Sequence, residues 1–474
     1  MRTQAKQIDD QAPTGLRVIF AGRRGRLLIA LLFAEFGGAV QSIAYSSVLP
    51  IASSALHGTS LYGATLAAGS FSVILMLAIG PVPFARLGPL ALLGTATTLY
   101  VLGAGLSVAA AEMPMLLAGT IIRGVGGGLL AGFGLSILGG LFHDQERIRV
   151  YGMFAIMWLL PSIVGPVVNA AVTIAWGWRA ALAWPAILVI IGRVLIGKQI
   201  DLVPWKRSTA ARPSFIWATA LLSGLIVATF ATLPKRGVGI ILLAAGCLLT
   251  STASLHILRI QVGRAGARLG KVMLLYLLCL CYFGGSGIIS LAAITGLGHG
   301  IVAGTGAVCA GQVAWSVTGF KPELADRWLP APRIAGLILI TVGLLLAFLT
   351  QTAANGITAL VVLIAAWFVA GIGMGIAYPR FSASAMDELP PDRVLAVATA
   401  VEFSETSATA VAGFIGGGTY SLARSLSLPA SSALSWAFAL LALVGVVSIA
   451  LYRPLWRGRP GTEAGTWRSS PGRQ

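Results

Sequence analysis

The organisation of the chain is set by two matching loops, Gly80-Pro-Val-Pro-Phe-Ala-Arg86-Leu-Gly88 and Pro322-Glu-Leu-Ala-Asp326-Arg327-Trp328. Each loop lies between the second and third apolar runs of a set of six. A second pair of loops matches as well, because Asp144-Gln-Glu-Arg147 and Asp387-Glu-Leu-Pro-Pro-Asp-Arg393 both separate the fourth run of a set from the fifth. The sequence therefore predicts two structurally equivalent halves, an organisation typical of secondary transporters.

Apolar runs long enough to cross a bilayer extend outward from these loops, and we count fourteen of them in the order six, two and six. The first six cover about 27–52, 61–81, 89–110, 115–141, 148–174 and 179–197. The middle two cover about 215–233 and 238–258 and are expected to form a helical hairpin. The last six cover about 272–295, 300–320, 334–352, 357–380, 394–422 and 430–452.

The composition requires a lipid environment. Of the 474 residues, 57% are hydrophobic and 10% are charged, and the mean hydropathy is +0.88. A soluble domain carries about 25% charged residues, so this chain lacks the polar surface that water would require. We predict an all-α polytopic membrane protein with these segments: tail 1–26, first six-helix bundle 27–197, central linker and hairpin 198–271, second bundle 272–452, and tail 453–474.

The distribution of basic residues predicts the orientation. The chain has 33 Lys and Arg against 15 Asp and Glu, a formal charge of +18. With fourteen spans and both termini in the cytoplasm, 28 basic residues lie inside, four lie outside, and Arg123 lies within a span. This asymmetry is the one expected for a bacterial-type plasma membrane protein, so the charge gives no reason to expect nucleic acid as a partner.

The sequence gives little sign of enzymatic chemistry. Its four cysteines lie in apolar runs without metal-ligand spacing, and the phosphate-binding pattern G-x-x-x-x-G-K-[ST] is absent. The spans contain no nucleophile with a base and an orienting group. We therefore expect no enzyme activity, no cofactor and no bound metal, and an ion gradient as the energy source.

Four strongly charged residues are expected within the spans: Glu35, Arg123, Glu402 and Glu405. A charge at the centre of a spanning helix costs about 2.5–3.5 kcal/mol on insertion scales, so it usually faces a cavity or a partner. At about 1.5 Å per residue, the three acids lie about 12–18 Å from the inner helix ends, near the bilayer midplane. Glu402 and Glu405 share one helical face, where two carboxylates cannot both ionise easily. We therefore expect the three acids to form a proton and cation site in which protonation and substrate binding exclude each other. The alternatives are permanently neutral acids or structural pairing.

The sequence resembles the major facilitator superfamily, and within it the fourteen-helix drug:proton antiporter branch, over residues 27–452. The matching segments are Leu324-Ala-Asp326-Arg327 in one loop, Arg86 and Gly88 in the other, Arg123-Gly-Val-Gly-Gly-Gly128 in the fourth span, Gly165-Pro166 in the fifth, and Ser47-Val-Leu-Pro-Ile51 in the first. Three departures occur: Ala85 replaces the loop aspartate, Gln41 replaces an upstream acid of the first span, and Asn169-Ala170 replace a closing glycine pair.

The resemblance implies roles for these positions. Arg123 would assist proton coupling, with a structural clamp as the alternative. Gly165 and Pro166 would form a conformational hinge, or a plain kink. Asp326 and Arg327, with Arg86 and Gly88, would act at the inner gate. Gln41 and the aromatic Tyr45 are expected beside Glu35 in the substrate cavity.

Two further features of the spans carry expectations of their own. Gly124, Gly128 and Gly132 recur every four residues, which favours close helix packing. Aromatic residues of the spans are expected either to stack on a ligand or to face lipid and core: Tyr45, Trp158, Tyr282, Trp315, Trp367, Tyr378 and Phe403.

The function that these observations favour is proton-coupled export of hydrophobic, cationic small molecules by alternating access, as in multidrug efflux and antibiotic resistance. Export of one dedicated metabolite, or uptake by proton symport, is the alternative within transport. A membrane enzyme, or a receptor or scaffold without flux, is the alternative from another class. The expected partners are a small-molecule substrate, protons and the lipid bilayer, with the monomer as the functional unit.

Overall fold

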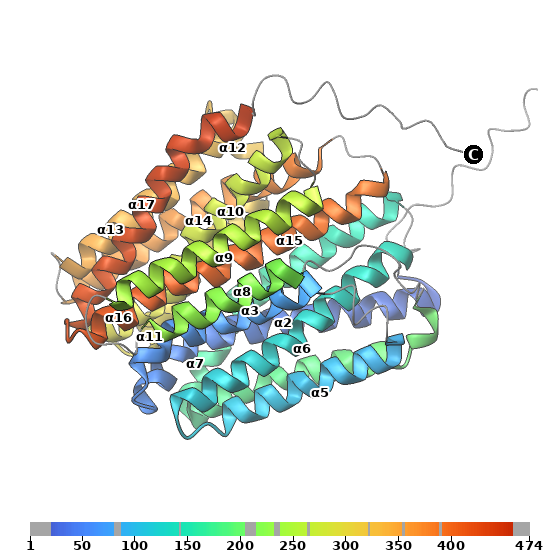
Figure 1. The fold of residues 1–474 in the computed structure, drawn as a ribbon, viewed down its shortest axis with the longest axis horizontal. Coiled ribbons are helices and arrows are strands. Elements are labelled where there is room, and N and C mark those ends of the chain that lie inside the picture. The colour runs from blue at the N-terminus through green and yellow to red at the C-terminus, as the bar shows by residue number, and fades with distance from the viewer. Residues whose placement is uncertain are drawn as a thin grey trace, which may run out of the picture.

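The helices of the protein run side by side along its long axis (Figure 1). The computed structural model describes residues 20–79, 87–141, 144–203, 215–231, 238–262, 266–320, 323–352, 356–387 and 391–457. All regular secondary structure in these ranges is helical. Eleven helices of the described part are long and apolar enough to cross a membrane. The chain is therefore an all-α, multi-pass membrane protein, as its composition predicts.

The first six predicted spans form one bundle. Its helices are α2 (Gly22–Ala55), α3 (Tyr62–Ile79), α5 (Pro89–Val108), α6 (Met113–Leu141) and α7 (Asp144–Gly197), with the 3-10 turns η1 (Thr59–Leu61) and η2 (Ile200–Leu202). α7 contains the fifth and sixth spans, which meet at Gly177. The φ of 85° and ψ of 168° at Gly177 are open almost only to glycine, so this residue lets the chain turn without a longer loop.

The last six predicted spans form the second bundle. Its helices are α10 (Gly266–Leu291), α11 (Ile301–Phe320), α12 (Glu323–Trp328), α13 (Pro332–Thr352), α14 (Gly356–Met386), α15 (Pro391–Gly413), α16 (Thr419–Ser425) and α17 (Ala430–Arg457). Short π-helical stretches extend α10 (η3, Ala292–Gly296) and join α15 to α16 (η4, Phe414–Gly418). The predicted span 394–422 thus comprises α15, η4 and α16. The expected fold class, two six-helix bundles with a two-helix insert, is confirmed.

The central insert is a tight hairpin of α8 (Phe215–Phe230) and α9 (Val238–Val262). Its helices pack through small residues, since a Cβ added to Gly246 would lie 2.6 Å from the Cβ of Ala228, and one added to Gly224 would meet Thr250. α8 packs against α3 of the first bundle, and α9 packs against α15 of the second (Figure 1). The hairpin therefore lies across the line along which the two bundles meet.

Glycines also bring α6 close to α3, as the four-residue spacing predicts. A Cβ at Gly124 would lie 2.7 Å from the carbonyl oxygen of Gly69, and a Cβ at Gly128 would lie 2.7 Å from the Cβ of Met76. Packing is thus confirmed as the role of these two glycines. The surroundings of Gly132 lie outside the described part of the structure.

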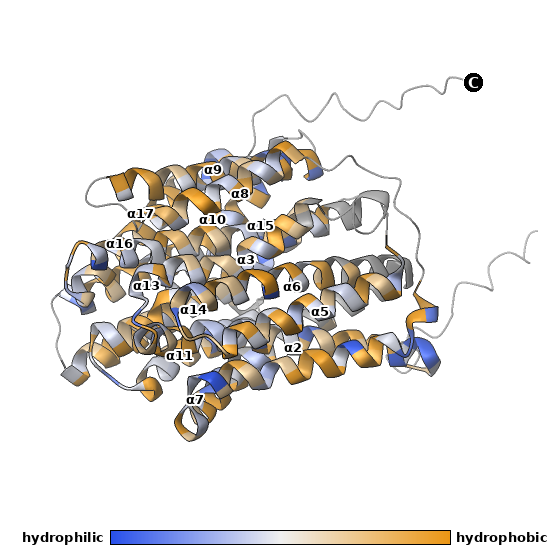
Figure 2. Cartoon of the chain, turned by 60° about the horizontal axis from the view of Figure 1, so that its bottom comes forward, coloured by the Kyte–Doolittle hydropathy of each residue, from blue (hydrophilic) through white to orange (hydrophobic). Residues whose placement is uncertain are grey.

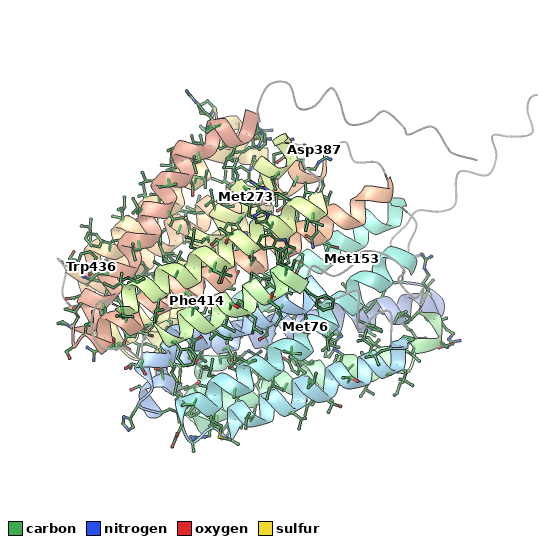
Figure 3. The ribbon with its side chains drawn as sticks, in the orientation of Figure 1. Met76, Met153, Met273, Asp387, Phe414 and Trp436 are labelled. Carbon is green, nitrogen blue, oxygen red and sulfur yellow. The ribbon has the colours of Figure 1, made fainter. Side chains whose placement is uncertain are left out.

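Apolar side chains cover much of the outer surface of the helices (Figure 2). Large hydrophobic residues are widely exposed there, for example Ile216 and Trp436, the second of which is labelled on α17 in Figure 3. Such a surface is unfavourable in water and is the one expected against lipid tails. The interior is packed with aromatic and aliphatic residues, such as Phe414 of η4, which is fully buried.

Candidate functional site

The two bundles touch closely along α3 and the segment from α15 to α16. The Tyr62 hydroxyl donates a 2.9 Å hydrogen bond to the carbonyl oxygen of Gly287, and the Gly63 amide donates one of 3.1 Å to Ser421 Oγ. A Cβ added to Gly413 would lie 2.9 Å from the Cα of Ala67. We call this contact the seam. It lies at the end of α3 farthest from the 80–88 loop, and it closes the molecule at that end.

Three acids that the sequence analysis singles out, from distant parts of the chain, lie close together. They lie on the side of the seam that faces the other end of the bundles. Glu402 and Glu405 lie on α15, and both are partly buried. Glu402 interacts electrostatically with Glu35 of α2 and with Glu405. The structure thus groups one acid of the first bundle with two of the second, although Glu35 and Glu402 lie far apart in the sequence.

Glu405 has a hydrogen-bond partner that the sequence does not reveal. The Tyr378 hydroxyl of α14 donates to Glu405 Oε1 at 2.9 Å. The Tyr378 ring meets the edge of Trp315 at 5.6 Å between centroids, Trp315 meets Tyr282 at 5.4 Å, and Tyr282 stacks on Trp367 at 5.2 Å. These four side chains form the aromatic cluster of the second bundle, and Tyr378 connects it to the acids.

Arg123 of α6 lies beneath an aromatic ring of the first bundle. Its guanidinium carbon is 3.7 Å from the centroid of the Tyr45 ring, and the residue is 8% exposed. Tyr100 of α5 interacts electrostatically with both Arg123 and Tyr45. Arg123 and Tyr45, both predicted for the site, are therefore in direct contact through a cation–π interaction.

Arg193 of α7 is a further charged residue inside a span, and the sequence count of four misses it. α2 and α7 touch at this level, because a Cβ added to Gly192 would lie 2.7 Å from the Cα of Ala34. The neighbouring residues, Arg193 and Glu35, interact electrostatically. Arg193 lies four residues before the end of its helix, a position typical of a loop-facing residue. Its place inside the apolar run 179–197 was the signal that could have found it.

Together these groups form a continuous line from one bundle to the other. Tyr100 interacts electrostatically with Arg123 and Arg193, Arg193 with Glu35, and Glu35 with Glu402, which leads to Glu405 and Tyr378. The first bundle contributes both arginines and Glu35 to this line, and the second bundle contributes Glu402 and Glu405. We call it the charged line. An arrangement of this kind can hold protons and bind a charged ligand between the bundles.

Gln41 lies six residues after Glu35 on α2 and is completely buried. Its Nε2 donates a 3.3 Å hydrogen bond to the carbonyl oxygen of Leu182 on α7. Its Oε1 has no hydrogen-bond partner among the described residues. The observed bond fastens α2 to α7, and a direct role for Gln41 in the cavity stays a prediction.

Gly165 and Pro166 are buried within α7, whose only non-helical backbone angles belong to Gly177. Asn169, one of the two residues that replace the closing glycine pair, has a hydrogen-bond partner. The Asn169 Oδ1 accepts a 2.8 Å hydrogen bond from Trp184 Nε1, so the side chain joins the two spans of α7 to each other. A hinge at Gly165 and Pro166 stays a prediction.

The inner-loop residues have different surroundings in the two halves. Asp326 of α12 forms a 2.7 Å ion pair with Arg380 of α14, whereas Arg327 is exposed. Gly88 precedes the first residue of α5 with extended backbone angles. Arg86 lies outside the described residues. The structure thus gives Asp326 a partner across its own bundle, and the gate function stays a prediction.

Known proteins resemble this chain in sequence and in fold. No family model matches the sequence. A protein of Mycobacterium tuberculosis strain H37Rv named "Probable multidrug-efflux transporter" is 26% identical over 74% of this chain and 78% of its own length. An "MFS-type transporter" of Aspergillus terreus is 26% identical over 32% of this chain and 28% of its own length.

Solved structures match over most of the chain. An auto-inhibited peptide transporter of the POT family has a TM-score of 0.66 at 14% identity, covering 90% of this chain and 97% of its own. A POT family transporter in complex with 5-aminolevulinic acid has a TM-score of 0.63 at 13% identity, covering 90% and 96%. The chain is therefore a transporter and not an enzyme. The chain therefore has the major facilitator fold, and its sequence is similar to those of multidrug-efflux transporters.

Proposed function

We propose that the protein exports hydrophobic, cationic small molecules in exchange for protons. The observation that carries this proposal is the grouping of Glu35, Glu402 and Glu405 between the two bundles. Acids inside a membrane are costly and usually mark an ion or substrate pathway. Here they come from both bundles, so any relative movement of the bundles changes the distances among them.

The proximity of the acids couples protons to substrate. Glu402 and Glu405 cannot both carry a charge easily in a low dielectric, so one of them holds a proton when the site is empty of cations. A cation entering the site favours the charged form and releases that proton. A proton entering from the other side displaces the cation. Protonation and substrate binding are then mutually exclusive, which is the requirement for exchange.

The aromatic cluster supports a hydrophobic cation as substrate. Tyr378 bonds to Glu405 and Trp315 packs against Tyr378, and aromatic faces attract desolvated cations by about 2 kcal/mol or more. Arg123 contacts Tyr45 in the first bundle, at the end of the charged line opposite to Glu405. In our proposal it favours the ionised form of the acids when the bundles bring it near and releases them when the bundles separate.

The seam supports alternating access. The predicted orientation places both chain termini in the cytoplasm, so Tyr62 and Gly63 lie at the outer end of α3. Their hydrogen bonds to Gly287 and Ser421 close the bundles on that side. The acids lie on the inner side of the seam. We infer that this conformation faces the cytoplasm, ready to load a substrate for export.

Purified protein in liposomes with an imposed pH gradient tests the proposal. The movement of ethidium is followed together with an internal pH dye, for the wild type and for Glu402→Gln/Glu405→Gln. The matched control is Glu112→Gln, an exposed acid outside the spans. We expect the wild type and the control to move ethidium against its gradient with opposite proton flow, and the double variant to do neither. Intact proton-driven transport after Gln replacement of all three acids would exclude the mechanism.

A second candidate is transport of a substrate that also carries an anionic group, as a dedicated metabolite exporter or an uptake symporter. Arg193 and Arg123 favour it, because they place two positive charges in the first bundle within the charged line. Radiolabelled zwitterionic metabolites in the same liposomes distinguish the two candidates. Proton-driven movement of such a substrate, without ethidium movement, would establish the second: opposite to the protons for an exporter, and in the same direction for a symporter.

A further inference from the structure

A groove opens between the central hairpin and the second bundle. It is lined by Ser251, Thr252, Leu255 and Leu258 of α9 and by Met273 and Tyr276 of α10. α9 rests on α15 and touches α10 only sparsely, which leaves the groove unfilled by protein. Met273 is labelled in Figure 3, where α9 lies in front of α10. The groove is separate from the charged line and from the seam.

The depth of the groove matches one leaflet of a bilayer. Leu258 lies four residues and Ser251 eleven residues from Val262, the end of α9. At about 1.5 Å per residue, the groove therefore runs from about 6 Å to about 16 Å from that end. Half of a hydrocarbon core is about 15 Å thick. The Ser251 and Tyr276 hydroxyls, 3.2 Å apart, hydrogen-bond at the deep end of the groove. The groove is about 10 Å long and ends near the midplane, so it fits the deeper part of an acyl chain of a single leaflet.

The shallow end of the groove carries a positive charge. Thr252, Leu255 and Arg259 follow one another at intervals of three and four residues, so they lie on one face of α9. Arg259 is exposed, and it lies in the last turn of the helix. Two other basic residues in the described part of this region are engaged elsewhere: Arg268 donates to the carbonyl oxygen of Asp387, and Lys271 lies over the ring of Trp456.

We propose that this groove binds an anionic phospholipid of the leaflet that contacts the α9–α10 connection, the cytoplasmic leaflet in the predicted orientation. One acyl chain fills the apolar groove as far as the Ser251–Tyr276 pair, and the phosphate lies beside Arg259. The lipid then joins the hairpin to the second bundle at a place where protein contacts are few. This lipid is a structural partner, and its binding does not depend on the transported substrate.

Thermal unfolding of the purified full-length protein in detergent, followed by tryptophan fluorescence, tests the proposal. The probes are dioleoylphosphatidylglycerol, dioleoylphosphatidylcholine with the same chains and a neutral headgroup, and inorganic phosphate without chains. We expect phosphatidylglycerol to raise the unfolding temperature at lower concentration than phosphatidylcholine, and phosphate alone to have no effect. Removal of one basic contact in Arg259→Gln is expected to raise the half-saturating phosphatidylglycerol concentration about five-fold.

Two further variants keep the outcome unambiguous. Thr252→Trp fills the groove from an exposed position and should abolish the response to phosphatidylglycerol. Arg327→Gln removes an exposed basic residue of α12 and should leave that response unchanged. Equal effects of the two lipids, an unchanged response in Arg259→Gln, or a response to phosphate alone would each overturn the proposal. Since unfolding is measured without transport, failure here leaves the exporter proposal untouched.

Discussion

The Tyr378 hydroxyl donates a 2.9 Å hydrogen bond to Glu405 Oε1, and this single bond joins the aromatic cluster to the acids of α15. Tyr378 lies on α14 and Glu405 on α15, 27 residues apart. A ligand that stacks on the aromatic cluster would therefore lie close to the Glu405 carboxylate as well. In the proposed exporter, this bond would connect substrate contact with proton binding.

Tyr378→Phe should slow transport without preventing folding. The variant keeps the ring and removes the donor, and a hydrogen bond to a charged group contributes about 1.5–3 kcal/mol, which is ten-fold or more in rate. We expect initial ethidium transport in proteoliposomes to fall about ten-fold. Because the two residues act as a unit, Tyr378→Phe/Glu405→Gln should be no slower than Glu405→Gln alone. Losses that multiply would show that they act separately. Tyr452→Phe, on α17 away from the acids, is the control.

Arg193→Gln should destabilise the protein through Glu35. The change removes a positive charge near a partly buried acid, which we expect to lower the free energy of unfolding by about 1–3 kcal/mol, since Arg193 is only partly buried. Glu35→Gln/Arg193→Gln should recover at least half of the loss. Thermal unfolding measures both. A double variant less stable than Arg193→Gln would show that the two charges do not support each other.

The sequence was sufficient to predict which acids lie within the spans, but it was insufficient to predict which residues contact them. Glu35, Glu402 and Glu405 stand out because each interrupts an apolar run, and the cost of such a charge implies a cavity or a partner. Arg193 stands out less clearly, because it lies near a helix end, where an arginine side chain commonly extends to the membrane surface. Only the contact between Gly192 and Ala34 shows that it lies beside Glu35.

The same distinction holds for the fold. The apolar pattern, the length of the apolar runs and the basic residues of the loops were enough to place fourteen spans. The bilayer imposes these properties on each helix separately. The turn at Gly177, the π-helical stretch η4 and the position of the hairpin depend on how helices meet. Arg380 became the partner of Asp326 only through the packing of α12 near α14, across 54 residues of sequence.

Asp326→Asn should have a small, salt-dependent effect on stability. The Asp326 side chain is 57% exposed, so its 2.7 Å pair with Arg380 contributes at most about 1 kcal/mol. Arg380→Gln should cost more, because that side chain is 11% exposed and also donates a 2.6 Å hydrogen bond to the carbonyl oxygen of Ile376. Thermal unfolding at low and high salt checks the order. A larger loss in Asp326→Asn than in Arg380→Gln would contradict it.

Gly63→Ala should prevent closure of the seam. A Cβ at this position would lie 2.1 Å from the Gly418 amide nitrogen and 2.3 Å from the Gly417 carbonyl carbon, so backbone atoms would have to separate. Gly69→Ala on the same helix is the control, because its Cβ would meet its nearest neighbour at an ordinary 3.6 Å. We expect ethidium transport to fall more than ten-fold in Gly63→Ala and to stay near wild type in Gly69→Ala.

The closed seam also predicts which residue becomes accessible in that variant. Ser421 is completely buried and accepts the Gly63 hydrogen bond. In a protein whose four native cysteines are replaced, Ser421→Cys should react slowly with a water-soluble maleimide. Addition of Gly63→Ala should accelerate the reaction at least several-fold, because the bundles then stay apart at that end. Equal labelling in the two backgrounds, together with lost transport, would mean that Gly63→Ala acts by distorting α3 and not by holding the seam open.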